Sequence, residues 1–407
     1  MRIIVIGAGI VGLTTAWWLA RDGHAVTVVD RDLAVGRGTS FANGAQLSFS
    51  YVAPMASRAV LANMGKYLLD RNSPVRFLPR MDPAQWRWVA SFLRACNAPA
   101  TAQNTAKLLA LSFASRIALH DMLAATPMQF HHARNGKLVV QSSAAAMADG
   151  QAQLKLQAAM GCEQFALTAA ECLVLEPALE SIAPRLVGGI HTPSEEVGDC
   201  HLLCQELHRI LAPKVEFRLG TEIKKLIVEQ SRVAALRTAA GDLEAELYIL
   251  AAGLDSRRLI SVPLQPIRGY SITARVRHTD RAPIRSVTDT FRKTVYAPLG
   301  PDIRVAGFAV VAGDRPELRP DRVASLTAAL ETTFPDACDL SDVHPWSGLR
   351  PATPTDVPQI GRSRLDNLLL NIGHGSLGFT LSAGSAKLVA DIVAGRPSPI
   401  PPAAYAQ

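Results

Sequence analysis

IIVIGAGIVGLTTAWWLARDGHAVTVVDR, residues 3–31, opens the chain with two short β-branched runs on either side of an apolar-periodic segment. The runs at residues 3–6 and 25–29 predict strands, because β-branched side chains favour extended backbone. The segment between them predicts a helix with Ala16 and Leu19 facing inward and with its end at Gly23. A strand, a crossover helix and a second strand form the unit from which parallel sheets are built. The stretch therefore predicts an α/β fold with a Rossmann-type domain at its start.

Glycines and one acidic residue stand at set positions in this unit. Gly7 permits the tight turn after the first strand, Gly9 lets the backbone approach a pyrophosphate, and Gly12 lets helix and strand pack closely. The N-terminus of the helix offers free N–H groups and a positive dipole end to phosphates. Asp30 ends the second strand, where its carboxylate can accept both hydroxyls of an adenosine ribose, and Arg31 is placed to lie against the adenine. The pattern indicates a bound dinucleotide but does not separate NAD from FAD.

A second strand–glycine–helix unit, LLLNIGHGSLGFTLSAG, occupies residues 368–384. The residues around it contain no second nucleotide domain. A polar loop at residues 36–46, rich in hydroxyl, amide and glycine positions, follows the first unit and can wrap a pyrophosphate and the edge of a heterocycle. We therefore expect both ends of the chain to bind the same cofactor.

Composition excludes several function classes. The chain has 407 residues, of which 48% are hydrophobic and 19% charged, as in a folded globular protein. The net charge is +7, but the basic residues are spread along the chain without a Lys/Arg block, so we expect no nucleic-acid partner. Weak attraction to an anionic membrane surface stays open. The uncharged run Ile3–Ala20 has the internal pattern of a folded βαβ unit rather than of a signal peptide or membrane span, so we expect a cytoplasmic enzyme.

Six scattered cysteines fit a reducing compartment rather than a disulfide framework. Cys200, Cys204 and His208 share one face of a helix that Asp199 would cap. A zinc site needs a fourth ligand and usually tighter turns, so we expect a half-buried helix face and no metal.

Further elements follow along the chain. Residues 82–125 show helical spacing of apolar side chains, and the tryptophans there are expected in the core. A second helix is expected at about 321–333. The expected strands include one that runs into Gly253, where small residues suit close approach to a cofactor, and the alternating patterns of an antiparallel sheet. They cover 137–140, 215–219, 233–238, 247–250, 265–276 and 294–311.

Several motifs together resemble one family: the FAD-dependent D-amino acid dehydrogenases, within the wider D-amino-acid-oxidase-like flavoproteins. The matching stretches are VIGAGIVGLTTAW (5–17), SFANGAQLSFSY (40–51), GDCH (198–201), PIRGYSIT (266–273), WSGLRPATPTDVPQIG (346–361) and NIGHGSLGFTLSAG (371–384). The resemblance implies a Rossmann-type FAD-binding domain interleaved with an antiparallel-sheet substrate domain, a composite α/β (α+β) fold. The FAD-binding domain is expected over 1–80, 161–260 and 335–407, and the substrate domain over 81–160 and 261–334.

The resemblance also implies how FAD is held. The 40–46 loop lies beside the flavin, and the turn after Gly375 closes on its pyrimidine edge, where helical N–H groups stabilise negative charge on the reduced ring. No cysteine or histidine attachment motif is matched, so we expect FAD to be bound non-covalently. The expected cofactor-binding residues are Gly7, Gly9, Ile10, Val11, Gly12, Asp30, Arg31, Ser40, Asn43, Gly44, Ala45, Gln46, Ile223, Gly253, Gly375, Leu377, Gly378 and Thr380.

The substrate implied by the family is a D-amino acid, oxidised by hydride transfer from Cα to flavin and released as a 2-oxo acid and ammonia. Arg350, stiffened by Pro351, is the expected partner of the substrate carboxylate, with Tyr270 and Tyr51 adding hydroxyls. His374 is a polar neighbour of the flavin without an assigned role. The resemblance favours a quinone or another respiratory acceptor over oxygen, and a peripheral contact with the inner face of the plasma membrane stays open.

Three alternatives remain at this point. The same flavin and arginine serve D-proline, D-hydroxyproline, sarcosine or glycine as substrates in related enzymes. A flavin-binding subunit without turnover of its own belongs to a different class. An NAD-dependent dehydrogenase would be colourless.

Overall fold

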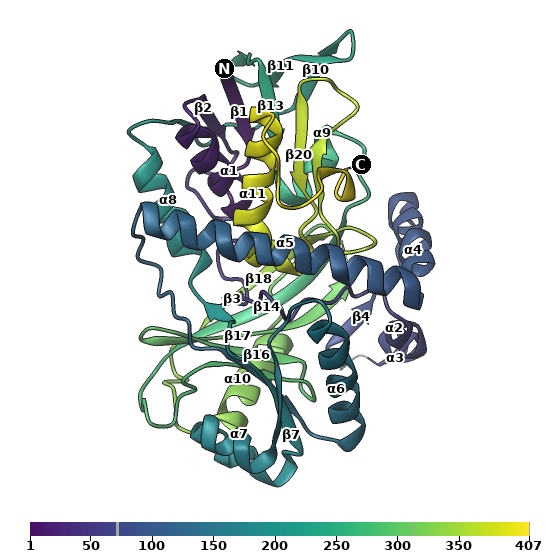
Figure 1. Cartoon of the computed structure of the whole chain (residues 1–407), viewed down its shortest axis with the longest axis vertical. Helices are drawn as coiled ribbons and strands as arrows, with labels where there is room; N and C mark the ends of the chain where they lie inside the picture. Colours follow the sequence, from purple (N-terminus) through teal and green to yellow (C-terminus); the bar gives the residue numbers. More distant parts are fainter. Residues whose placement is uncertain (71–72, 312, 407) are drawn as a thin grey trace.

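The computed structural model describes residues 1–70, 73–311 and 313–406 (Figure 1). A six-stranded sheet at one end of the molecule combines strands from both ends of the chain with β9 and β13 from its middle, in the order β19-β20-β13-β1-β2-β9. Its strands are parallel except for β19, which is antiparallel to β20. They are β1 (Arg2–Ile6), β2 (Ala25–Val29), β9 (Glu216–Arg218), β13 (Leu247–Leu250), β19 (Gln359–Arg362) and β20 (Leu368–Ile372). The first and second glycine units therefore belong to one sheet, as the sequence predicts.

Helices pack against this sheet and against one another. α1 contacts both α11 and α8, and the long α5 runs across α11 (Figure 1). These helices are α1 (Ile10–Arg21), α5 (Ala98–Ala125), α8 (Cys200–Leu211) and α11 (Gly378–Ala394). Ala16 and Leu19 of α1 are fully buried in the resulting core, as expected. Burial of this apolar layer supplies the main driving force that holds the two chain ends together.

A nine-stranded, largely antiparallel sheet forms the other end of the molecule. Its order is β18-β14-β17-β16-β15-β5-β7-β6, and β4 pairs with β17. The strands are β4 (Val75–Phe77), β5 (Lys137–Gln141), β6 (Phe165–Thr168), β7 (Gly188–Thr192), β14 (Gln265–Arg275), β15 (Ser286–Asp289), β16 (Thr294–Leu299), β17 (Asp302–Val311) and β18 (His344–Ala352). α6 (Ala144–Ala158), α7 (Ala169–Leu175) and α10 (Pro320–Thr333) lie at this end.

Smaller elements complete the chain. β10 (Lys225–Glu229), β11 (Arg232–Thr238) and β12 (Gly241–Leu243) form a three-stranded antiparallel sheet, and β3 (Gln46–Leu47) pairs with β8 (Glu196–Val197). The remaining α-helices are α2 (Arg58–Ala62), α3 (Met64–Leu69), α4 (Pro83–Ala95) and α9 (Ser256–Leu259). Short 3₁₀ turns are η1 (Pro177–Arg185), η2 (Gly253–Asp255), η3 (Gly375–Leu377) and η4 (Pro402–Ala404).

The structure corrects several expectations from the sequence. Residues 82–125 form two helices, because Asn97 caps a new helix after α4 ends. Trp88 is buried as expected, but Trp86 is 48% exposed and Ile117 is 62% exposed. The expected strand at 294–311 is a hairpin of β16 and β17.

The expected division into domains stays a prediction, but sheet pairing differs from it in places. β6 and β7 lie within 161–260, and β18 lies within 335–407, yet all three pair in the nine-stranded sheet. β4, within 1–80, pairs there too.

Two segments have the length and hydropathy of membrane-crossing helices: Ala98–Ala125 and Gly375–Ala394. Both pack against other helices of the fold, and a buried core helix passes the same test. The uncharged N-terminal run forms β1 and α1, as expected.

Candidate active site

A cavity of about 1320 Å³ lies between the two sheets and contains the motifs singled out in the sequence. One end is lined by the glycine turn after β1 and by residues that follow β2 and β13. The other end is lined by strands β14, β16, β17 and β18 of the nine-stranded sheet. Ligands of open α/β sheets bind outside the carboxyl ends of the strands, which is where the first group lies. The cavity can therefore hold an elongated dinucleotide with a substrate beyond it.

Close packing explains the glycines of the first turn. Gly7 has φ of 113°, and a Cβ there would lie 2.6 Å from the carbonyl oxygen of Ala251. A Cβ on Gly12 would overlap the carbonyl oxygen of Gly7. Gly12 does not line the cavity, so its part in cofactor binding is to let α1 start close to β1. Gly9 caps α1 without a side chain, and of the first-turn N–H groups only that of Ile10 has a side-chain acceptor among the described residues, the Oγ of Ser40.

Asp30 is fixed at the end of β2 by two backbone donors. Its Oδ2 accepts from the N–H of Ala8 at 2.6 Å, and its Oδ1 accepts from the N–H of Asp32 at 2.9 Å. Burial raises the pKa of this carboxyl group, although the two N–H donors oppose the shift. Arg31 forms an ion pair with Asp255 at 3.0 Å. Both Asp30 and Arg31 line the cavity, and their contacts with ribose and adenine remain predictions.

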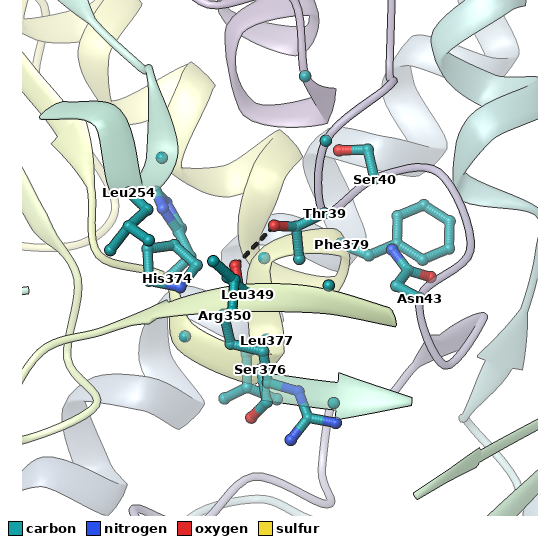
Figure 2. A pocket seen from close by; sticks show the side chains of 18 of the residues that line it. Thr39, Ser40, Asn43, Leu254, Leu349, Arg350, His374, Ser376, Leu377 and Phe379 are labelled. Atoms are coloured by element: carbon teal, nitrogen blue, oxygen red, sulfur yellow. Dashed lines mark hydrogen bonds between the residues drawn. The ribbon is translucent and has the colours of Figure 1, made fainter. Parts of the chain in front are cut away.

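The loop at 40–46 lies between the first glycine turn and the nine-stranded sheet. Ser40 Oγ accepts from the N–H of Ile10 at 3.1 Å. The Asn43 carbonyl accepts from Arg304 at 3.0 Å, and the Asn43 side chain accepts from the N–H of Ala45 at 3.0 Å. Thr39 donates to the carbonyl of Leu349 at 2.7 Å, so the loop is also tied to β18 (Figure 2). The loop is therefore a fixed wall of the cavity rather than a solvated surface loop.

The second glycine unit reaches the cavity from the other side. η3 and α11 begin without side-chain caps, which leaves N–H groups of their first turns open to a ligand. His374 precedes them, is 4% exposed, and its Nε2 has no hydrogen-bond partner among the described residues. Burial lowers the pKa of His374 to about 3, so the ring is neutral. Asn371 Oδ1 is also buried without a partner in the described part of the chain, and both residues line the cavity.

Arg350 lies on β18 at the sheet end of the cavity. Its Nη1 donates to the carbonyl of Phe308 at 3.1 Å, and its guanidinium lies against Gly269, where a Cβ would come within 2.6 Å of Nη2. In Figure 2 the Arg350 side chain leaves β18 on one side of the strand, and Thr39 contacts the strand from the other side. Burial lowers the pKa of Arg350, and no carboxylate of the described residues forms an ion pair with it. Arg350 is half-buried as a residue, and a desolvated cation without an anion is costly unless a ligand supplies one.

Both predicted tyrosines line the cavity. Tyr270 is 2% exposed and makes an edge-to-face contact with Phe308, with ring centroids 5.8 Å apart. Tyr51 lies against the Lys137 ammonium and is 39% exposed, while partial desolvation of its hydroxyl in the cavity raises the pKa of that group. Arg350, Tyr270 and Tyr51 are thus brought to one cavity, while their contacts with substrate remain predictions.

The other predicted cofactor-binding residues are also brought together. Apart from Gly12, all of them line the same cavity, including Ile223 and Gly253 from the middle of the chain. The face of α8 that carries Cys200, Cys204 and His208 is capped by Asp199 as expected, and both cysteines are buried. The described residues hold no group of three or more metal-ligating side chains.

Lys137 and Phe308 are among the residues of the cavity wall that sequence reasoning missed. Lys137 is a buried cation at the start of β5, and a charged residue opening an otherwise apolar strand is the signal that could have found it. Phe308 has φ of 66°, where β14 and β17 shift register, and this left-handed backbone turns its carbonyl toward Arg350. No sequence pattern marks such a position.

Comparisons with known proteins agree with this geometry. Residues 2–392 match the family model DAO, described as FAD dependent oxidoreductase. The chain is 47% identical to D-amino acid dehydrogenase 2 of Ralstonia nicotianae, over 100% of this chain and 99% of that protein. It is 43% identical to D-amino acid dehydrogenase 2 of Pseudomonas aeruginosa, over 98% of this chain and 96% of that protein. Glycine oxidase from Bacillus cereus has the same fold, with a TM-score of 0.75 at 18% identity over 98% of this chain and 96% of that one.

The shape and the polar groups of the cavity fit FAD. Glycines leave room for the pyrophosphate, and N–H groups in the first turns of α1 and α11 face the cavity. Buried atoms of His374 and Asn371 have no hydrogen-bond partner among the described residues. Its sheet end leaves space for a substrate beside Arg350. With the family model matched over nearly the whole chain, these features establish that the protein belongs to the DAO family of FAD-dependent oxidoreductases.

Proposed function

We propose that this enzyme oxidises D-amino acids to 2-oxo acids and ammonia. The observation that carries the proposal is Arg350: a half-buried guanidinium at the sheet end of the FAD cavity, with one backbone acceptor and no carboxylate partner among the described residues. A planar cation in that position suits a ligand carboxylate. The names of the full-length relatives, D-amino acid dehydrogenases, support the choice of substrate.

The protein's part in the reaction is to bind and orient. Arg350 holds the substrate carboxylate, and the hydroxyls of Tyr270 and Tyr51 complete its binding. FAD, when bound, supplies a two-electron acceptor for the hydride from the substrate Cα. The resulting imino acid takes up water and loses ammonia. No side chain needs to act as an obligate general base, and the low pKa of His374 keeps that residue neutral beside the cofactor.

A panel of amines tests this proposal. The purified holoenzyme is assayed with an artificial dye acceptor against D- and L-alanine, D- and L-leucine, D-proline, D-hydroxyproline, sarcosine and glycine, and 2-oxo acid and ammonia are measured. We expect turnover of primary D-amino acids with equal amounts of both products. Turnover confined to the secondary amines or to glycine would transfer the assignment to those substrates. Absence of turnover with every amine would favour a flavin-binding subunit.

We propose further that a quinone or another respiratory acceptor reoxidises the enzyme at the inner face of the plasma membrane. The relatives are named dehydrogenases, which supports an acceptor of this kind. The net charge of +7 supports an electrostatic contact with the membrane. Membranes from the expressing cells are washed with high salt. We expect the activity to be released, because salt screens charge contacts. Activity released only by detergent would indicate hydrophobic anchoring instead.

A further inference from the structure

Exposed apolar side chains gather on α2, α3, α4 and the segments that join them, at one edge of the molecule (Figure 1). α3 contacts both α2 and β4, and the ring of Phe77 on β4 lies 6.2 Å from that of Trp86 on α4, so these elements are neighbours. We call the exposed side chains of residues 58–94 the α2–α4 surface. Its large apolar members are Leu61, Leu68, Leu69, Met81, Trp86 and Leu93. Apolar side chains grouped on an exposed surface indicate a binding partner.

α4 shows how its sequence produces this exposure. Its inner face, which includes Trp88, is buried against side chains of β14, β17 and β18. Trp86 and Leu93 stand seven positions apart and lie on the outer face. Arg87 and Arg94 follow each of them by one position and are exposed as well. The outer face of α4 therefore carries an apolar row beside a basic row, as helices that lie at a membrane interface do.

Positive charge is concentrated in the same part of the chain. Residues 51–97 contain seven basic and two acidic residues, so this stretch carries +5 of the net charge of +7. Its two carboxylates, Asp70 and Asp82, are half-buried, and Asp82 caps α4. The exposed arginines of the α2–α4 surface form no ion pair with a carboxylate of the described residues, and they are Arg58, Arg80, Arg87 and Arg94. Their charge is complementary to an anionic partner.

The FAD cavity opens beside this surface. Tyr51 and Ala53, which precede α2, line the cavity and are exposed. Pro74 and Val75, at the start of β4, line it as well. The segment that carries α2 and α3 thus leaves the cavity wall and returns to it. A membrane docked on this segment would lie next to the cavity, where an apolar electron acceptor dissolved in the lipid can reach it.

We propose that the α2–α4 surface docks the enzyme on an anionic lipid membrane, with its arginines at the headgroups and its apolar side chains at the acyl boundary. The proposal rests on the membrane contact proposed above and names the surface that makes it. An anionic bilayer takes up both features at once, because it offers negative headgroups and an apolar layer beneath them. Stable attachment needs both contributions, so screening of the charges by salt releases the enzyme.

Flotation of the purified holoenzyme with lipid vesicles tests this surface. Vesicles of phosphatidylcholine alone are compared with vesicles that also contain anionic phosphatidylglycerol. We expect binding to the anionic vesicles only, and its loss at high salt. Arg87→Gln/Arg94→Gln should lower the partition coefficient about thirtyfold, since each basic residue near an anionic surface contributes about fivefold. Leu69→Ser/Met81→Ser should lower it about tenfold or more, because these exposed side chains no longer bury apolar area in the membrane.

Two double variants outside the surface are matched controls. Arg362→Gln/Arg364→Gln makes the same change of charge at exposed positions. Leu33→Ser/Val174→Ser replaces side chains that are 87% and 83% exposed, while Leu69 is 84% exposed and Met81 is fully exposed. Both controls should bind vesicles like the wild type. All four variants change exposed side chains outside the cavity wall, so Tm, FAD content and turnover of D-alanine with a dye acceptor should stay near the wild-type values.

Unchanged vesicle binding of either test variant would overturn the docking surface, and so would an equal loss of binding in the controls. A wild type that binds washed cell membranes but floats with no lipid vesicle would indicate a protein partner and would overturn lipid docking. A wild type that binds neither would overturn the membrane contact on which the proposal rests. Turnover of D-alanine with the dye acceptor in that last case would leave the oxidation of D-amino acids intact.

Discussion

Replacement of Arg350 by leucine removes the cation that we assign to the substrate carboxylate. In the described part of the chain the guanidinium has one acceptor, the Phe308 carbonyl at 3.1 Å, so its other N–H groups remain for a ligand. A hydrogen bond to a charged group contributes roughly 1.5–3 kcal/mol, which corresponds to about ten- to a hundredfold in binding. We therefore expect Arg350→Leu to raise KM for D-amino acids by at least that range. Arg350→Lys keeps the charge but loses the planar fork, so its KM should lie between that of the wild type and that of Arg350→Leu.

The assay measures steady-state kinetics and FAD content on the same preparations. Arg364→Leu is the matched control, because Arg364 is an exposed arginine outside the cavity. FAD content should stay near the wild-type value in all three variants. Amines that lack a carboxylate should lose little on mutation of Arg350. Wild-type kinetics of Arg350→Leu would show that the carboxylate is bound elsewhere, and loss of FAD from that variant would make Arg350 a cofactor ligand instead.

Two further predictions concern the cofactor and the fold. Acid precipitation should release all yellow colour into the supernatant, because no attachment motif is matched; colour kept in the pellet would show a covalent bond. Gly12→Ala should lower Tm clearly more than Gly38→Ala, since a Cβ on Gly12 overlaps the Gly7 carbonyl and one on Gly38 meets nothing within 4 Å; equal Tm values would contradict this packing.

The parts of the fold that sequence predicts well are those with local physical causes. The turn at Gly7 needs a positive φ and space beside Ala251, so glycine is required there and the pattern is visible in the sequence. The capping of α8 by Asp199 is likewise set by neighbouring residues. Motifs from both chain ends meet at one cavity because β1 and β20 both pair with β13.

Other features depend on packing between distant segments and leave no local pattern. Trp86 and Trp88 stand two positions apart in α4, and only the contact of that helix with the rest of the fold decides that Trp88 is buried and Trp86 exposed. The direction of Lys137 depends on the pairing of β5 with β15 and on the position of Gln46. Which strands join the nine-stranded sheet also depends on pairing between segments far apart in the sequence, and composition does not reveal that pairing.

Anaerobic mixing of the yellow holoenzyme with single enantiomers tests most directly whether the protein oxidises D-amino acids. One equivalent of D-alanine or D-glutamate should bleach the flavin absorbance after mixing and yield one equivalent of 2-oxo acid. The L-enantiomers should leave the colour unchanged. Colour that persists with every D-amino acid, or bleaching by the L-enantiomers alone, would contradict the proposed function.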